Sequence, residues 1–229
     1  MPRHRQALSV TGYIMTTFER LIVFLLLGLS SCGQRSSDNE IHPTPVELNE
    51  QAMKLVPFIE NPDSSKKAIN LLDRATTIDS TYFLGYVNKL MFYYQLRLFD
   101  KALLANNRLI QLRPFAHDLY LRSGFLYTHL GDTSMAKAYF TKGLTICNSV
   151  LDTMTRTNRD YVLLMTNRAI ALIMLDDSAK ANKNLKTLYD IQLGDPNFDN
   201  IDKEYILSLM NKSRKELIGL ISEADKYSR

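Results

Sequence analysis

The chain has 229 residues, of which 45% are hydrophobic and 23% are charged, and its formal net charge is +4 at pH 7. This length suits one domain with a substantial core, and the weak charge without a basic cluster argues against a nucleic-acid partner. With only two cysteines, Cys32 and Cys147, the chain cannot be a disulfide-rich scaffold.

The first element in chain order is a short apolar segment. Residues 21–29 (LIVFLLLGL) follow Arg20 and precede Ser30, Ser31 and Cys32. A helix that spans a bilayer takes about 20 apolar residues, so this segment is too short for one. A basic residue, a short apolar stretch and small residues are typical of a secretory signal peptide.

The end of this segment, Leu29-Ser30-Ser31-Cys32, resembles the lipobox of bacterial lipoproteins. The resemblance implies that residues 1–31 are a lipoprotein signal peptide and that Cys32 becomes the first mature residue and carries the lipid. In Gram-negative lipoproteins that stay in the inner membrane, aspartate often follows this cysteine. Gly33 stands there in this chain, so the resemblance predicts a cell-envelope protein anchored by lipid in the outer membrane.

Two alternatives stay open at this end of the chain. The segment could be an ordinary signal peptide with a chance cysteine, and translation could begin at Met15 instead of Met1. Removing residues 1–31, which hold three arginines and one glutamate, leaves a net charge of +2. Residues 32–45 are polar with two prolines, which predicts a flexible tether that begins at the lipidated Cys32.

Helical periodicity dominates from Val46 onward, and no strand pattern appears. We expect one helix over about residues 47–60, closed by Asn61-Pro62-Asp63, and a second that Ser64 or Ser65 caps. Further helices are expected over about residues 82–96, 99–112 and 116–130, another from near 134, and a last one over about 202–227.

An internal repeat underlies these helices. Ala68, Ala102 and Ala136 lie 34 residues apart, a period typical of a solenoid of helix pairs. Ala181 follows 45 residues after Ala136, and the additional 11 residues equal about three helical turns at 3.6 residues per turn. We therefore expect longer helices around residues 146–154 and 160–175.

The third copy resembles the tetratricopeptide repeat family. Its tyrosines, its Ser123-Gly124 pair and the later Ala136-x3-Phe140 follow the family pattern W-x2-L-G-x2-Y…A-x3-F. The small residues let helices approach closely, and the large ones fill the space between pairs. The predicted packing residues are Ala68, Ala102, Ala136, Ala181, Tyr93, Gly124, Tyr127 and Phe140.

The resemblance implies an all-α fold, a right-handed solenoid of antiparallel helix pairs. About four repeats would occupy residues 46–192, and residues 200–229 would form a C-terminal capping helix. In this family the first helix of each pair lines an inner groove. The candidate partner-binding residues there are Met91, Tyr94, Gln95, Phe125, Thr128, His129 and Ile170. This surface could bind a peptide or helix, or the C-terminal segment could cover it.

Catalytic motifs are not found in the sequence. It contains no HExxH, CxxC, G-x-S-x-G or Gly-rich phosphate loop, so we expect no enzyme, no metal site and no cofactor. The leading hypothesis is a membrane-anchored scaffold, an assembly or accessory factor that binds another envelope protein or peptide. The alternatives are an immunity lipoprotein that neutralises a toxin directed to the periplasm and, less favoured, an enzyme without a recognisable motif.

Overall fold

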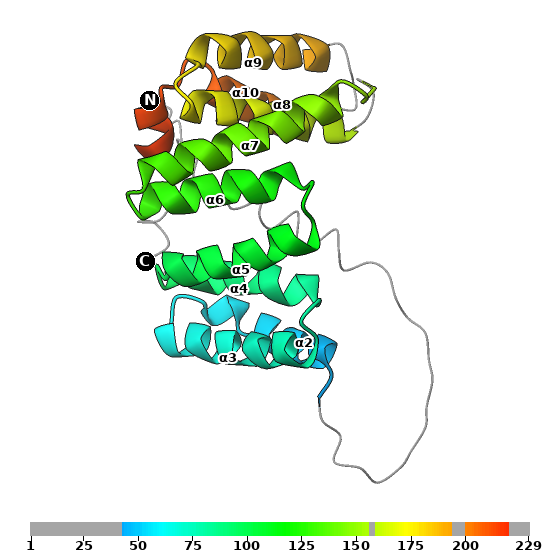
Figure 1. Ribbon diagram of the computed structural model, residues 1–229, viewed down its shortest axis with the longest axis vertical. Helices are drawn as coiled ribbons and strands as arrows, with labels where there is room; N and C mark the ends of the chain where they lie inside the picture. The colour runs from blue at the N-terminus through cyan, green and yellow to red at the C-terminus, as the bar shows by residue number, and fades with distance from the viewer. Residues whose placement is uncertain (1–42, 156–158, 194–199, 220–229) are drawn as a thin grey trace, which may run out of the picture.

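The computed structural model describes residues 43–155, 159–193 and 200–219. The predicted signal peptide and Cys32 lie outside these residues, as does most of the tether. The described helices, labelled as in Figure 1, are α2 Pro45–Met53, a 3-10 helix η1 Val56–Phe58, α3 Pro62–Ile78, α4 Phe83–Gln95, α5 Phe99–Leu112, α6 His117–His129, α7 Thr133–Leu151, α8 Arg159–Met174, α9 Ser178–Leu193 and α10 Asn200–Leu209.

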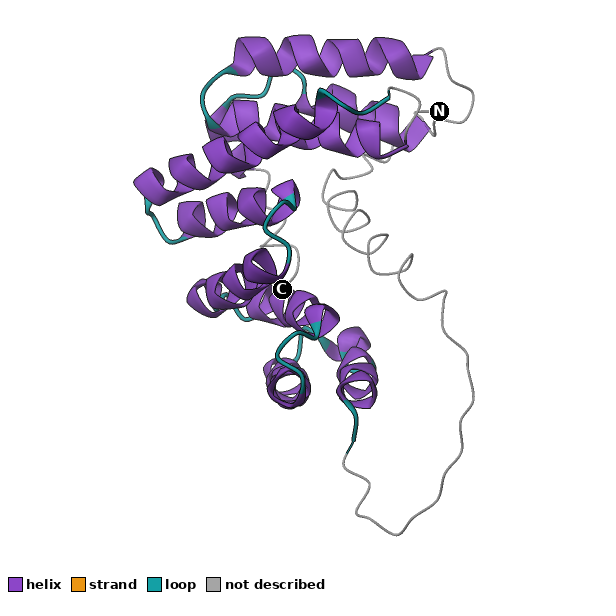
Figure 2. Cartoon of the chain, turned by 45° about the vertical axis from the view of Figure 1, so that its right-hand side comes forward, coloured by secondary structure: helices purple, strands orange, loops and turns teal. Residues whose placement is uncertain are grey.

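These helices stack in chain order into a solenoid (Figures 1 and 2). Each helix packs against the next, so that α2 with α3, α4 with α5, α6 with α7 and α8 with α9 form antiparallel pairs. The part of the chain that the structure describes contains no strand. The predicted all-α solenoid of helix pairs is confirmed.

The insertion before the fourth copy lies largely in helix, as its length predicts. Helix α7 has 19 residues against 14 in α5, and α8 has 16 against 13 in α6. The remaining three residues of the insertion fall in the connection between α7 and α8. The insertion thus lengthens the second helix of the third pair and the first helix of the fourth.

The first predicted helix, over residues 47–60, is divided in the structure. Thr44 and Glu47 form a capping box that starts α2, with the Glu47 carboxylate accepting from the Thr44 backbone N–H at 2.7 Å. Pro57 carries no N–H, so the backbone continues as the short η1 instead of α-helix. The next helix is capped by the Asn61 side chain and not by Ser64 or Ser65.

Every pair from the second onward turns through one left-handed residue. The positive φ angles are 55° at Arg97, 79° at Gly131, 63° at Asp176 and 61° at Asn211. These residues are 34, 45 and 35 apart, so the first three follow the alanine register and Asn211 extends it by one copy. Left-handed backbone favours glycine and, after it, asparagine and aspartate, the residue types found at three of the four turns.

The last of these turns interrupts the single C-terminal helix expected over about residues 202–227. Helix α10 ends at Leu209, and a new helix occupies residues 214–219. Ser213 and Glu216 start it with a second capping box, in which the carboxylate accepts from the Ser213 N–H at 2.7 Å. The C-terminal segment is therefore a fifth helix pair in the repeat register, where one capping helix was predicted.

The predicted packing residues lie in the interior. Ala68, Ala102, Ala136 and Ala181 are fully buried, and Tyr93 is nearly so. Gly124 faces the ring of Phe140, and a Cβ on this glycine would come within 2.7 to 2.8 Å of three ring carbons. Tyr127 is half-buried and packs on Tyr139, with ring centroids 5.2 Å apart. Helices α6 and α7 thus approach closely at Gly124.

The residue types at this contact differ in the second copy. In the second copy the large residue is Leu90 on the first helix, and Asn106 stands at the place that corresponds to Phe140. The buried Asn106 amide donates to the Leu119 carbonyl at 2.7 Å and to the Ser123 hydroxyl at 2.8 Å. This departure from the family pattern converts an apolar contact within a pair into a hydrogen-bonded link between the second and third pairs.

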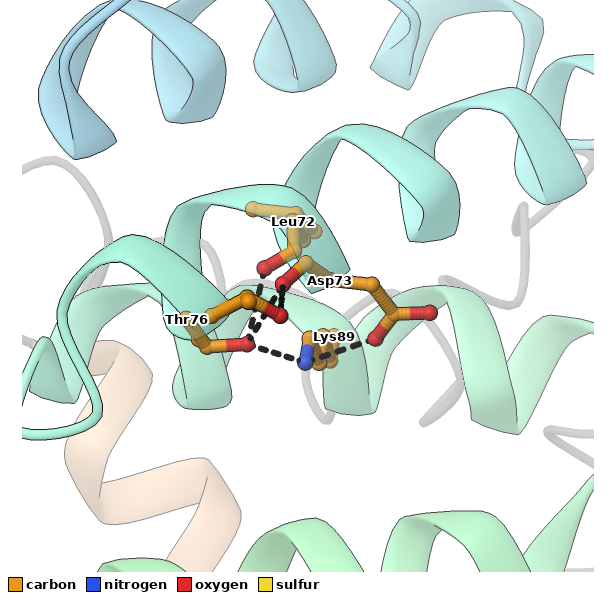
Figure 3. A network of polar contacts seen from close by, with 5 residues as sticks. Leu72, Asp73, Thr76 and Lys89 are labelled. Atoms are coloured by element: carbon orange, nitrogen blue, oxygen red, sulfur yellow. Dashed lines mark hydrogen bonds and ion pairs between the residues drawn. The ribbon is translucent and has the colours of Figure 1, made fainter.

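A buried lysine links the first two pairs (Figure 3). Lys89 on α4 is 6% exposed, and its ammonium donates to the Thr76 hydroxyl at 2.6 Å and pairs with the Asp73 carboxylate at 2.7 Å. Thr76 in turn donates to the Leu72 carbonyl at 3.0 Å. Burying a charge is costly unless it is paired and hydrogen-bonded, and these partners on α3 meet that need.

Candidate functional site

The candidate groove residues occupy equivalent places on successive first helices. Met91 on α4, Phe125 on α6 and Ile170 on α8 follow each other at intervals of 34 and 45 residues, the register of the alanines. These three, together with Tyr94, Gln95, Thr128 and His129, are all half-buried. The structure thus places the seven residues at the boundary between the core and the surface.

Two of them, Tyr94 and His129, contact the same aromatic ring, that of Phe99. The His129 imidazole stacks on Phe99 with centroids 4.5 Å apart and planes 9° apart, and Tyr94 contacts the same ring edge-on at 6.2 Å. The Arg97 guanidinium lies 5.3 Å from the Phe99 centroid. Phe99, the first residue of α5, was not among the predicted site residues, although it joins the ends of α4 and α6.

The remaining residues contribute to the core as well as to the surface. Phe125 packs edge-on against Phe140 at 5.0 Å, and the Thr128 hydroxyl donates to the Gly124 carbonyl at 2.9 Å. Met91 and Ile170 pack on neighbouring buried clusters. Substituting any of these apolar residues would disturb the packing of the core, so partner binding at them stays a prediction. A test of that binding needs a more exposed residue on the same surface.

Leu163 on α8 is such a residue. It lies seven residues, about two helical turns, before Ile170 on α8 and therefore on the same face of the helix. Its side chain is 47% exposed, so it is one of nine large apolar residues that are open to solvent in the described part of the chain. Sequence reasoning missed Leu163, although the seven-residue interval from Ile170 could have indicated it.

A polar link connects the first helices of the third and fourth pairs. The Asn167 side-chain amide on α8 lies 3.0 Å from Nε2 of His117 on α6. An amide nitrogen can only donate, so Nε2 accepts and must be deprotonated. Burial lowers the pKa of His117, and the nearby Asp118 carboxylate opposes this shift in part.

The link predicts a loss of stability in acid. Because the pKa of His117 is lower in the folded state than in the unfolded state, its contribution is complete above the unfolded value of about 6.5 and falls as the pH drops below it. We expect urea unfolding at pH 5 to show a smaller free energy of unfolding than at pH 7.5, with a smaller pH difference in His117→Gln. Equal differences in the two proteins would contradict this role.

Neither a metal site nor an activated thiol is found among the described residues. They contain no group of three or more His, Cys, Asp or Glu side chains that could hold a metal ion. Burial raises the pKa of the Cys147 thiol to about 12, so it stays protonated and is not an activated nucleophile. Across residues 43–155, 159–193 and 200–219, none of the helices is long and apolar enough to cross a bilayer.

Comparison with known proteins supports the resemblance to tetratricopeptide repeats. Residues 117–149, which span α6 and most of α7, match the family model described as tetratricopeptide repeat. No curated protein matches the chain in sequence. The matched residues include the Gly124–Phe140 contact, so the copy with the clearest family pattern has the small-against-aromatic packing that this pattern implies.

Several solved structures are similar to this chain at low sequence identity. A set of nearly identical TPR-like repeats from Podosopora anserina is 13% identical, with a TM-score of 0.51 over 79% of this chain and 93% of that one. PilW, a type IV pilus biogenesis factor, is 19% identical, with a TM-score of 0.48 over 82% of this chain and 75% of that one. MamA is 13% identical, with a TM-score of 0.48 over 82% and 98%.

The fold is a solenoid of helix pairs, and one of its copies, residues 117–149, matches a tetratricopeptide repeat. Arrays of this type are in general surfaces for binding other proteins and not catalysts. The candidate site consists of the half-buried residues on α4, α6 and α8, together with Leu163, and partner binding there stays a prediction.

Proposed function

We propose that this protein is a lipid-anchored scaffold of the cell envelope that binds another envelope protein or peptide along the first helices of its repeats. The observation that carries the proposal is the exposure of Leu163, in line with the half-buried Ile170, on a helix whose opposite face is core. An apolar side chain that stays open to solvent beside other apolar side chains suits an apolar segment of a partner.

The anchor is part of the same proposal. Its support is the lipobox-like sequence that ends at Cys32, followed by the polar residues 33–42. Helix α2 begins after this segment, so an outer-membrane lipid at Cys32 would hold the solenoid near the membrane by its first pair. A partner in the same envelope then meets the scaffold at a raised local concentration.

Leu163→Glu tests the binding surface with little risk to the fold. We expect the variant to keep its unfolding midpoint within about 2 °C, because the side chain is already exposed, and to lose about tenfold or more of its crosslinked partner in native membranes. The identity of that partner separates an assembly factor from an immunity protein that holds a toxin.

Leu104→Glu is the matched control. Leu104 is 70% exposed on α5, a second helix, and its substitution makes the same change of side chain. The control should capture the partner as the natural protein does. Equal capture by both variants would overturn the assignment of the binding surface to the first helices.

A further inference from the structure

The charged residues on the exposed faces of α7 and α9 are mainly lysines. Helix α7 carries two lysines and no acidic residue, and α9 carries three lysines and only Asp190. Lys180 is neutralised by Asp177, with 2.6 Å between Nζ and Oδ2. The other four lysines are exposed, and none forms an ion pair with the part of the chain that the structure describes: Lys137, Lys142, Lys183 and Lys186.

The repeat register places these four lysines on one side of the solenoid. Ala136 and Ala181 are equivalent and fully buried, so each marks the inward direction of its helix. At about 100° per residue, Lys183 and Lys186 point within about 40° of the direction opposite to Ala181, and Lys137 and Lys142 lie about 80° and 60° to either side of the direction opposite to Ala136. Because successive pairs stack in register, the exposed faces of α7 and α9 turn toward the same side.

We propose that this lysine face, formed by Lys137, Lys142, Lys183 and Lys186, docks on an anionic phospholipid surface and so sets the orientation of the solenoid on its membrane. The proposal rests on the lipid anchor proposed above, which keeps the domain beside that surface. Lysines near an anionic bilayer each contribute favourably, and the attraction is lost within about a Debye length, roughly 10 Å at 0.1 M salt.

The composition of this face favours lipid over a protein partner. Its other exposed residues are mainly threonine, serine and alanine, with Asp190 as the one acidic residue, and Met135 at 37% is the one large apolar side chain exposed on the described parts of α7 and α9. Protein interfaces are instead enriched in aromatic residues and arginine and depleted in lysine, serine and alanine. Exposed lysines among small side chains suit the diffuse negative charge of phosphate headgroups.

The equivalent helix at the other end of the solenoid provides an internal control. Helix α3 carries Lys66 and Lys67, but it also carries two acidic residues, and Lys66 pairs with Asp63 at 3.2 Å. Lysine reactivity in this helix should therefore not respond to anionic lipid. Both sets of lysines belong to one molecule, so differences in protein amount or labelling time cancel.

The test is acetylation of lysines in the full-length lipidated protein, reconstituted into vesicles and read by mass spectrometry. One set of vesicles is pure phosphatidylcholine, and the other contains about one third phosphatidylglycerol. We expect the four lysines to react at least about threefold more slowly in the anionic vesicles, with unchanged reactivity at Lys66 and Lys67. Salt at 0.5 M should remove the protection, because it shortens the Debye length.

Charge reversal completes the test. Lys183→Glu with Lys186→Glu should abolish the protection of Lys137 and Lys142, whereas Lys66→Glu with Lys67→Glu, an equal change of charge, should not. Equal reactivity in the two kinds of vesicle would overturn the docking proposal. Protection seen in native membranes but not in anionic vesicles would also overturn it and would indicate an acidic protein instead. A protein that fails to enter vesicles at all would contradict the proposed anchor and not the lysine face.

Discussion

Cys32→Ala is expected to abolish lipid labelling and to move the protein from the membrane fraction to the soluble fraction. The nine-residue apolar segment before Cys32 is too short to span a bilayer, so it cannot replace a lipid as a stable anchor. A thiol on the first mature residue is the group that would carry the lipid. Growth with a radiolabelled fatty acid, followed by fractionation of the cells, measures both effects.

Cys147→Ala is the matched control for this experiment. Cys147 is the other cysteine of the chain, and it is fully buried in α7. Its substitution removes a thiol that cannot reach an acyl donor, so label and membrane association should both remain. Membrane association of Cys32→Ala at the level of the natural protein would refute the lipid anchor.

The spacing of small residues predicted the fold well because a solenoid repeats one local arrangement. Each pair must bury an alanine at the same point, so Ala68, Ala102 and Ala136 report the period directly. The 11-residue shift before Ala181 was also interpretable, because three additional turns keep the buried face in phase. Such regularities are local, and the sequence displays them without any knowledge of distant contacts.

The fifth pair was missed for an equally local reason. The apolar residues of 202–227 follow a helical period that continues through Asn211, so periodicity alone predicted one helix. The sequence Ser213-x-x-Glu216 is a capping box, and asparagine two residues before it is a residue type that accepts left-handed backbone. A capping box inside a periodic segment is a stronger indication of a helix boundary than the period is of one continuous helix.

The site was predicted only in outline because contacts between side chains of different pairs depend on the stacking. The repeat register located Tyr94 and His129, but nothing in the spacing places both against Phe99. Similarly, the hydrogen bond between Asn167 and His117 joins residues 50 apart, across the displaced fourth copy. The sequence predicts which helix face a residue occupies, and the stacking decides what it meets.

The stacking of the helices also predicts a large loss of stability when the contact between Gly124 and Phe140 is altered. Gly124→Ala should lower the free energy of unfolding by about 1 to 3 kcal/mol, the usual cost of overpacking a core. The added Cβ would lie 2.7 to 2.8 Å from three carbons of a ring that is fully buried and held edge-on by Phe125. Since alanine is the better helix former by about 0.5 to 1 kcal/mol, any net loss measures the collision and not the propensity.

The equivalent residues of the fourth copy indicate a second substitution that should restore part of the stability lost in Gly124→Ala. Ala169 and Leu185 have the same 16-residue interval as Gly124 and Phe140, and both are fully buried. The double variant Gly124→Ala with Phe140→Leu reproduces that pair. We expect Phe140→Leu alone to cost about 1 kcal/mol or more from lost volume, and the double variant to be more stable than the sum of the single changes by about 1 kcal/mol or more. Additive losses in urea unfolding would mean that α6 and α7 can separate to admit the methyl group, so that the glycine does not set their distance.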